Sequence, residues 1–200
     1  FVCHDVERNK LVYLKDYWRT DFPGIEKEGD IYHDLLEAKV HFIPELGPAG
    51  NVLSTPEHSL DMANTNVFGV PVHLRVKRYV HYRLVLNTLG QPLSTFGSTW
   101  ELCQVIRDAM IAHTDAYDKA KILHRDVSAG NILIAPDQSG LLIDWDMSKR
   151  VDVTQQRQHS RTGTWQFIST GLLLHPHARS HQISDDIESF YWVLIYIVMK

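Results

Sequence analysis

The feature that most constrains this chain is a group of polar residues on two segments that a predicted turn brings together. His124-Arg-Asp126 is followed by Asn131, and Asp144-Trp-Asp146 lies further along the chain. Between them, residues 127–146 alternate short strand-like runs with turns, and residues 136–140 have the composition of a hairpin turn. Because a hairpin returns the chain to the same place, Asp126, Asn131 and Asp144 are expected to lie side by side.

These residue types suit the transfer of a phosphoryl group. That reaction needs a carboxylate that orients the attacking hydroxyl and oxygen ligands that hold magnesium across the nucleotide phosphates. Asp126 fits the first role, and Asn131 and Asp144 fit the second, because hard cations prefer carboxylate and amide oxygens. The alternative is that three polar residues lie on adjacent loops without a shared task. The separation of Asp126 from Asn131 matches the catalytic loop of protein kinases and favours the first interpretation.

The composition excludes several other classes of protein. The chain has 200 residues, 44% hydrophobic and 22% charged, which predicts one or two globular units with a sizeable core. A net charge of −4 does not suggest a nucleic-acid surface or a polybasic membrane anchor. Two cysteines and no leader sequence favour an intracellular location, in cytoplasm or nucleus. The apolar run 190–199 is about half the ~20 residues that span a bilayer, so we expect a buried helix.

The order of the predicted elements is strands first and helices later. Residues 11–14 form a strand ending at Lys15, residues 25–36 have helical spacing, residues 47–69 read as an irregular insertion, and residues 72–76 and 82–86 are strand-like. Turn-forming residues at 88–92 mark a boundary between two lobes. Ser98 and Glu101 have the spacing of a capping box, which starts a long helix. Its expected inner face holds Leu102, Val105, Ile106, Ala109, Met110, a core histidine at 113, Ala116, Tyr117 and Ala120.

Three segments resemble the fungal-type protein kinases, also called FunK kinases. They are residues 122–133, residues 142–146 and residues 163–167, and residues 185–190 are similar to the start of the central C-lobe helix in casein kinase I. The motifs cover residues 122–198, and weaker matches extend to residue 11. By this resemblance Asp126 is the catalytic base, Asn131 and Asp144 bind metal, and Asp186 braces the catalytic loop from the last helix. That helix is expected to start behind Ser184, with two aspartates in its first turn.

Lys15 and Glu28 are predicted to form an ion pair. Lys15 matches the kinase lysine that contacts the α- and β-phosphates, although the local pattern alone also fits a surface lysine. Glu28 lies on the inward face of its predicted helix, where an unpaired carboxylate would be costly. Glu26, the rival partner, is expected on the polar face. The resemblance implies that this pair sets the active position of the helix.

The resemblance assigns further residues to nucleotide binding and to regulation. Residues 85–90 match the hinge between the lobes, with Leu86 as the gatekeeper and the main-chain amide of Leu89 at the adenine of ATP. His124 and Trp145 are expected to pack behind the site. Arg125 is implied to bind a phosphate on the activation segment, with Thr154, Ser160 and Thr162 as candidate phosphorylation sites.

Three departures from the kinase pattern bear on activity. Residues 1–14 hold no glycine, so the glycine-rich loop is expected upstream of this chain or is absent. Ser128 stands where serine/threonine kinases carry a lysine, and Asp146 stands where the metal motif has glycine. Aminoglycoside and choline kinases also carry an acidic residue there, which leaves a small-molecule phosphotransferase open. Without a glycine-rich loop we expect this chain, taken alone, to be a poor enzyme. We also expect it to be poorly stable, because its last helix is apolar on every face from Phe190 onward and needs further helices to cover it.

Together these features predict an α+β, two-lobed protein-kinase-like fold truncated at both ends. Residues 1–88 are a partial N-lobe without the glycine-rich loop, and residues 89–200 are a partial C-lobe. The expected reaction transfers the γ-phosphoryl group of ATP, with Mg²⁺, to serine or threonine of a protein substrate. The alternatives are a small-molecule phosphotransferase and a non-catalytic pseudokinase. The segment at Gly163 and Thr164 disfavours the first, because it resembles the peptide-positioning activation segment that small-molecule kinases lack. Retention of Lys15, Asp126, Asn131 and Asp144 disfavours the pseudokinase.

Overall fold

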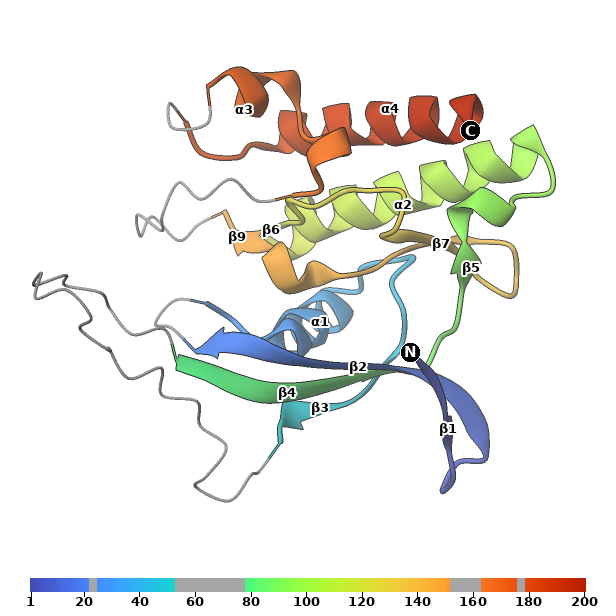
Figure 1. The fold of residues 1–200 in the computed structure, drawn as a ribbon, viewed down its shortest axis with the longest axis vertical. Helices are drawn as coiled ribbons and strands as arrows, with labels where there is room; N and C mark the ends of the chain where they lie inside the picture. Colours follow the sequence, from blue (N-terminus) through green and yellow to red (C-terminus); the bar gives the residue numbers. More distant parts are fainter. Residues whose placement is uncertain (22–24, 53–77, 152–162, 176–178) are drawn as a thin grey trace, which may run out of the picture.

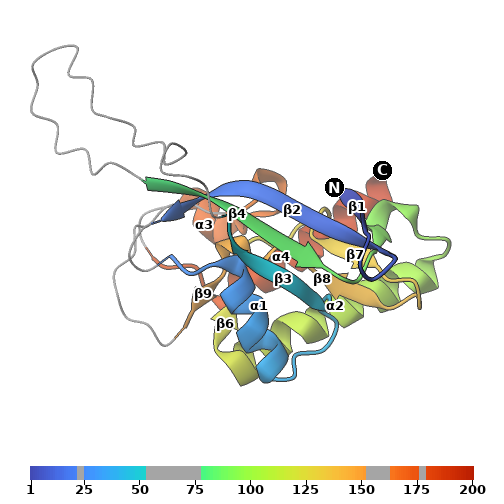
Figure 2. The ribbon, with the colours of Figure 1, turned by 90° about the horizontal axis from the view of Figure 1, so that it is seen from below.

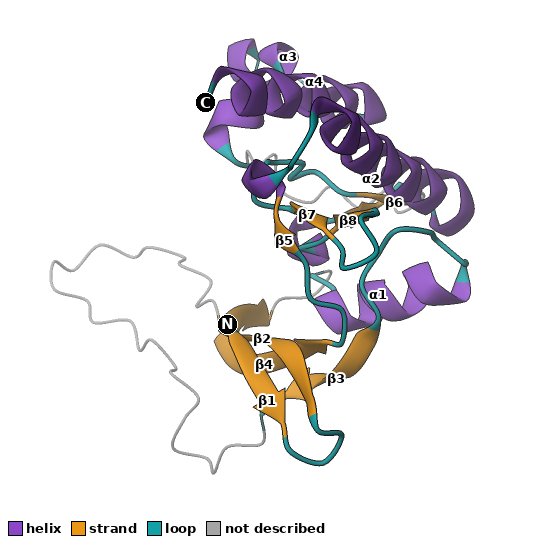
Figure 3. Cartoon of the chain, turned by 90° about the vertical axis from the view of Figure 1, so that its right-hand side faces the viewer, coloured by secondary structure: helices purple, strands orange, loops and turns teal. Residues whose placement is uncertain are grey.

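The computed structural model describes residues 1–21, 25–52, 78–151, 163–175 and 179–200. A four-stranded antiparallel sheet with one helix occupies one end of the molecule, and two long helices with short strands occupy the other (Figures 1 and 3). This arrangement agrees with the predicted α+β class, while the division into lobes at residues 88 and 89 stays a prediction. In chain order the elements are β1 (Val2–Asp5), β2 (Lys10–Asp21), α1 (Glu28–Glu37), β3 (Leu46–Asn51), β4 (Arg78–Leu86), β5 (Gln91–Pro92), η2 (Leu93–Thr95), α2 (Thr99–Ala120), β6 (Ile122–Leu123), β7 (Ile132–Ile134), β8 (Gly140–Leu142), η3 (Trp145–Met147), β9 (Lys149–Arg150), η4 (Trp165–Phe167), α3 (Thr170–Leu174) and α4 (Ile183–Met199).

The large sheet has the strand order β1-β2-β4-β3, and Figure 2 shows β2, β4 and β3 side by side. The predicted strand at residues 11–14 continues to Asp21, so Lys15 lies inside β2, opposite Leu84, and not at its end. Since side chains alternate along a strand, Lys15 and Tyr17 share one face. The prediction of an irregular stretch from residue 47 was wrong for residues 47–51, which form β3 against β4. The rest of that insertion and the predicted strand 72–76 lie outside the described residues.

Helix α1 starts at Glu28, three residues later than the hydrophobic spacing predicted. Its buried face carries Glu28, Ile31, Tyr32 and Leu35, which confirms the predicted helical phase. The helix contacts β3 of the large sheet, and it also contacts α2 and η3 of the helical part. Helix α1 therefore joins the two ends of the molecule.

Helix α2 begins where the sequence predicted. The hydroxyl of Ser98 accepts a hydrogen bond from the Glu101 amide at 3.2 Å, whereas the Glu101 carboxylate accepts from the amide of Gly97 and not from that of Ser98. The predicted capping box is therefore formed only in part: Ser98 caps the helix as predicted, but Glu101 binds the amide one residue before Ser98. The predicted inner face of α2 is buried at most positions, and His113 lies in the core with no exposed surface.

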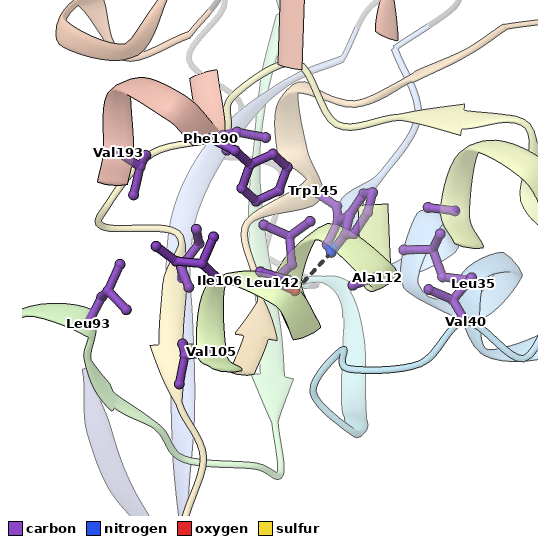
Figure 4. Close-up of a cluster of buried hydrophobic side chains, with 14 of the residues drawn as sticks. Leu35, Val40, Leu93, Val105, Ile106, Ala112, Leu142, Trp145, Phe190 and Val193 are labelled. Carbon is purple, nitrogen blue, oxygen red and sulfur yellow. Dashed lines mark hydrogen bonds between the residues drawn. The ribbon is translucent and has the colours of Figure 1, made fainter. Parts of the chain in front are cut away.

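One hydrophobic cluster connects the two ends of the molecule. It runs from Leu84 of β4 and Leu35 of α1, past Trp145, to Phe190 of α4. Figure 4 shows Trp145 between α1 and the residues of α2 and β8, with its indole N–H donating to the Leu142 carbonyl at 3.2 Å. Because the cluster is continuous, shared side-chain packing fixes the position of the sheet relative to the helical part.

Helix α4 begins at Ile183, just before the Ser184 boundary that the sequence indicated, and Asp185 and Asp186 lie in its first turn as predicted. One face is buried through Phe190, Val193 and Ile197. Several of its other apolar side chains, among them Tyr191 and Met199, are exposed, whereas Trp192 and Leu194 are half-buried. Among the described residues, no helix combines the length and apolar character that crossing a bilayer requires.

Asp185 fastens the segment before α4 to the helix. Arg179 donates two hydrogen bonds of 2.6 Å to its carboxylate, Ser169 donates one of 2.5 Å, and the Gln182 amide donates one of 2.8 Å. Burial alone would raise the pKa of Asp185, but the hydrogen bonds from Arg179, Ser169 and Gln182 lower this pKa from 3.8 to about 2. The folded state therefore favours the ionised carboxylate more than the unfolded chain does.

This shift predicts a pH-dependent loss of stability. The contribution of Asp185 is present above about pH 4 and is lost as the pH falls toward 2, and it amounts to about 2 kcal/mol. We expect Asp185→Asn to lower the free energy of unfolding at pH 6 and to flatten its decline between pH 5 and pH 3, measured by urea unfolding. Asp118→Asn, on the exposed side of α2, is the control. A decline as steep in Asp185→Asn as in the wild type would contradict the assignment.

Gly140 allows β8 to lie directly on α2. A Cβ atom at this position would stand 2.1 Å from the backbone oxygen of Val105, whereas a Cβ atom at Gly50 of β3 would meet no atom within 4 Å. We expect Gly140→Ala to lower the free energy of unfolding by roughly 1–3 kcal/mol, because β8 must move away from α2. Gly50→Ala should change it by less than about 0.5 kcal/mol. Equal urea midpoints for the two variants would show that the contact is not tight.

Candidate active site

The predicted ion pair between Lys15 and Glu28 is present. The Lys15 ammonium donates to Glu28 Oε2 at 2.7 Å, and the Glu28 side chain is 1% exposed. Burial, the largest cause, raises the pKa of Glu28 to about 7, and the neighbouring Lys15 limits this rise. Burial would lower the pKa of Lys15, but the carboxylates of Glu28 and Asp144 raise it overall, so the lysine stays charged. A single ammonium thus offsets a carboxylate that is almost fully removed from water.

The same ammonium also reaches Asp144. Lys15 Nζ donates to Asp144 Oδ1 at 2.7 Å, so one cation joins a carboxylate of α1 to a carboxylate between β8 and η3. Asp144 has φ 65° and ψ 67°, a left-handed conformation that few residues other than glycine adopt. The sequence predicted both residues at the nucleotide phosphates and gave no sign that they would contact each other.

Asp126 and Asn131 lie together, as their five-residue spacing in the predicted catalytic loop implied. The side-chain amide of Asn131 donates to the Asp126 carbonyl at 2.8 Å and to its carboxylate at 3.3 Å. The Thr164 amide and hydroxyl both donate to Asp126 Oδ1, at 2.7 and 2.8 Å. Sequence reasoning did not foresee this contact, although it placed Thr164 in the segment that positions a peptide. The carboxylate of Asp126 is therefore held from both sides while the residue stays half-buried.

Asp186 holds the loop that carries Asp126, as predicted. Its carboxylate accepts from the Arg125 amide at 3.0 Å and from the rings of His113 and His181 at 2.8 and 2.6 Å. Burial would raise the pKa of Asp186, but the hydrogen bonds from the two histidines lower it. An ionised carboxylate with no exposed surface thus anchors the backbone immediately before Asp126.

His124 and Trp145 pack behind the site, which confirms their predicted role. Their ring centroids lie 4.5 Å apart in an edge-to-face arrangement. Burial lowers the pKa of His124 and keeps the ring neutral. Its Nδ1 accepts from the Asp126 amide and its Nε2 faces the Ile143 carbonyl, which fits a neutral ring protonated at Nε2. The histidine therefore links the backbone of Asp126 to the backbone of Ile143, the residue immediately before Asp144.

Two groups of contacts near α1, one around Tyr17 and one around Arg150, were not foreseen. The Tyr17 hydroxyl lies 3.3 Å from Glu28 Oε2 and 3.1 Å from Asp146 Oδ1. Glu26 precedes α1 and pairs with Arg150 of β9 at 2.7 Å, and Arg150 also pairs with Asp34 of α1. The expectation that Glu26 lies on a polar helix face was therefore wrong, because Glu26 is outside the helix and takes part in an ion-pair network.

Other predicted residues are placed apart from this cluster or are not described. Leu89 is half-buried in the loop between β4 and β5, and its contact with adenine stays a prediction. Leu86 is buried at the end of β4. Ser128 is buried, and its carbonyl accepts from the Asn131 amide at 3.1 Å. The candidate phosphorylation sites Thr154, Ser160 and Thr162 lie outside the described residues.

The residues present fit a magnesium ion that a nucleotide helps to hold. Asn131 donates through its amide nitrogen to Asp126, which leaves its amide oxygen as the acceptor end, and Asp144 is 38% exposed. Such hard oxygen ligands suit Mg²⁺, which keeps waters and binds substrate phosphates in addition to one or two protein ligands. Within the described ranges, no three histidine, cysteine, aspartate or glutamate side chains are grouped so that they could hold a metal by themselves.

Comparison with known proteins adds an independent line of evidence on the family of this chain. Part of the chain is similar to serine/threonine-protein kinase PLK4 of Nematostella vectensis, with 24% identity over 98 residues, which are 49% of this chain and 9% of that relative. The sequence model of the fungal protein kinase family matches residues 33–198, a range that contains Asp126, Asn131, Asp144 and Asp186. This match covers most of the chain and agrees with the motifs from which the site is built, so the chain belongs to the fungal protein kinase family.

Proposed function

We propose that this chain carries the catalytic centre of an ATP- and magnesium-dependent protein kinase that phosphorylates serine or threonine hydroxyls. The observation that carries the proposal is the position of the Lys15 ammonium, held at 2.7 Å from both Glu28 and Asp144. A cation fixed in this way binds phosphate oxygens without having to reorganise. We further propose that the chain is divided into two lobes and that the backbone of Leu89, between them, binds the adenine of ATP.

Each site residue has a distinct part in the proposed reaction. Lys15 binds the α- and β-phosphates, and Glu28 keeps the lysine in place from α1. Asp126 accepts a hydrogen bond from the substrate hydroxyl and orients its oxygen toward the γ-phosphorus. Asn131 and Asp144 would hold Mg²⁺, which neutralises phosphate charge when it is bound. Positioning and charge are what phosphoryl transfer needs most, because its transition state requires little covalent chemistry from the protein.

A protein substrate is favoured over a small molecule by the segment at Gly163 and Thr164. Thr164 donates twice to Asp126, so the backbone that follows the activation segment is tied to the residue that meets the substrate hydroxyl. A peptide lying along this backbone would present its hydroxyl to Asp126. The similar protein from Nematostella vectensis is a serine/threonine-protein kinase, which agrees with serine or threonine as the acceptor.

The proposal predicts that Asp126→Asn separates turnover from binding. The amide cannot accept the hydroxyl proton, so transfer of labelled phosphate from ATP to casein should fall at least about a hundredfold. Affinity for ATP, measured by calorimetry, should change little, because Asp126 faces the acceptor and not the nucleotide. Asp137→Asn in the exposed hairpin turn between β7 and β8 is the matched control.

The same assay tests the rival functions. Transfer to kanamycin or choline, with none to casein, would replace the protein kinase by a small-molecule phosphotransferase. Binding of ATP without any transfer by the wild-type protein would support a pseudokinase. Full transfer to casein by Asp126→Asn would refute the assignment of the catalytic base.

A further inference from the structure

Tyr17 stands in the same relation to the site as Lys15. Both side chains leave the same face of β2, two residues apart, and both reach Glu28 Oε2. Lys15 also contacts Asp144, and Tyr17 also contacts Asp146, which again is two residues further along. The two donors of β2 therefore each join α1 to one carboxylate of the segment that follows β8.

The contacts of the Tyr17 ring are independent of the contacts of its hydroxyl. The ring meets Tyr82 edge-to-face with centroids 5.7 Å apart, and its centre lies 4.8 Å from the Lys15 ammonium. These ring contacts need no hydroxyl. The hydroxyl brings one proton between the carboxylates of Glu28 and Asp146, so it donates to one of them at a time or to both in a bifurcated hydrogen bond. Burial and the two carboxylates raise the pKa of Tyr17, so this donor stays protonated.

We propose that Tyr17 and Asp146 form a second bridge that holds α1 and the Asp144 segment in the arrangement that brings Lys15, Glu28 and Asp144 together. The inference rests on the proposed function, since it makes Tyr17 a positioning residue for phosphoryl transfer. Its physical basis is the exposure of Lys15 and Asp144, 23% and 38% of the side chains, which leaves the first bridge open to water. A partly exposed ion pair such as Lys15–Asp144 restrains its partners less than a fully buried one, and a neighbouring hydrogen bond to a carboxylate adds restraint.

The test uses Tyr17→Phe in the full-length protein, because phenylalanine keeps the ring contacts and removes only the hydroxyl. We expect kcat to fall about tenfold, which corresponds to the loss of one hydrogen bond to a charged group, with KM for the protein substrate unchanged. Tyr13→Phe removes a hydroxyl from the same face of the same strand and should leave kcat unchanged. Asp146→Ala should lower kcat to a similar extent, and the double variant Tyr17→Phe/Asp146→Ala should be no slower than the slower single variant.

Hydrogen exchange provides a readout that does not depend on turnover. Tyr17→Phe should speed amide exchange in residues 28–37 of α1 and in residues 144–147, and Tyr13→Phe should not. Unchanged exchange in Tyr17→Phe would overturn the bridge, and faster exchange with unchanged kcat would overturn its role in positioning. Multiplicative losses in the double variant would show that Tyr17 and Asp146 act independently. If the wild-type protein transfers no phosphate, the proposed function fails, and exchange alone decides whether the bridge exists.

Discussion

The ammonium of Lys15, held between the carboxylates of Glu28 and Asp144, is the interaction on which the rest of the site depends. Three separate parts of the chain supply its members: β2, α1 and the segment after β8. Glu28 is buried, so moving Lys15 away would leave an uncompensated charge in the interior, at a cost of several kcal/mol. The pair therefore requires the sheet, the helix and the hairpin to keep one arrangement.

Much of the supporting structure could be predicted from the sequence because local patterns determine it. The helical phase of α1 follows from the spacing of Ile31, Tyr32 and Leu35, and this phase is enough to assign Glu28 to the buried face. The hairpin between β7 and β8 follows from its turn residues, and with it the return of the chain from Asn131 to Ile143, whose amide donates to the Asn131 carbonyl at 2.9 Å. The bracing by Asp186 follows from a family resemblance and agrees with its hydrogen bond to the Arg125 amide.

The remaining contacts could not be predicted because they join polar residues that are far apart in the sequence and follow no periodicity. Tyr17 and Asp146 are one such pair, and Thr164 and Asp126 are another. In the sequence, Asp146 stands out only as a departure from the kinase pattern, and its partner Tyr17 gives no signal because a tyrosine in a strand is ordinary. The position predicted for Glu26 was wrong for a different reason. Helical spacing gives the phase of a helix but not its first residue, and Glu26 lies before the start of α1.

In the proposed function, the Lys15, Glu28 and Asp144 cluster is the phosphate and metal end of an ATP site. The most direct measurement is calorimetric titration of ATP into the wild-type protein and Asp144→Asn, each with and without Mg²⁺. We expect Mg²⁺ to strengthen ATP binding at least about tenfold in the wild type and to have little effect in Asp144→Asn. Equal strengthening by Mg²⁺ in both proteins would contradict this expectation, because the metal would then be held without Asp144.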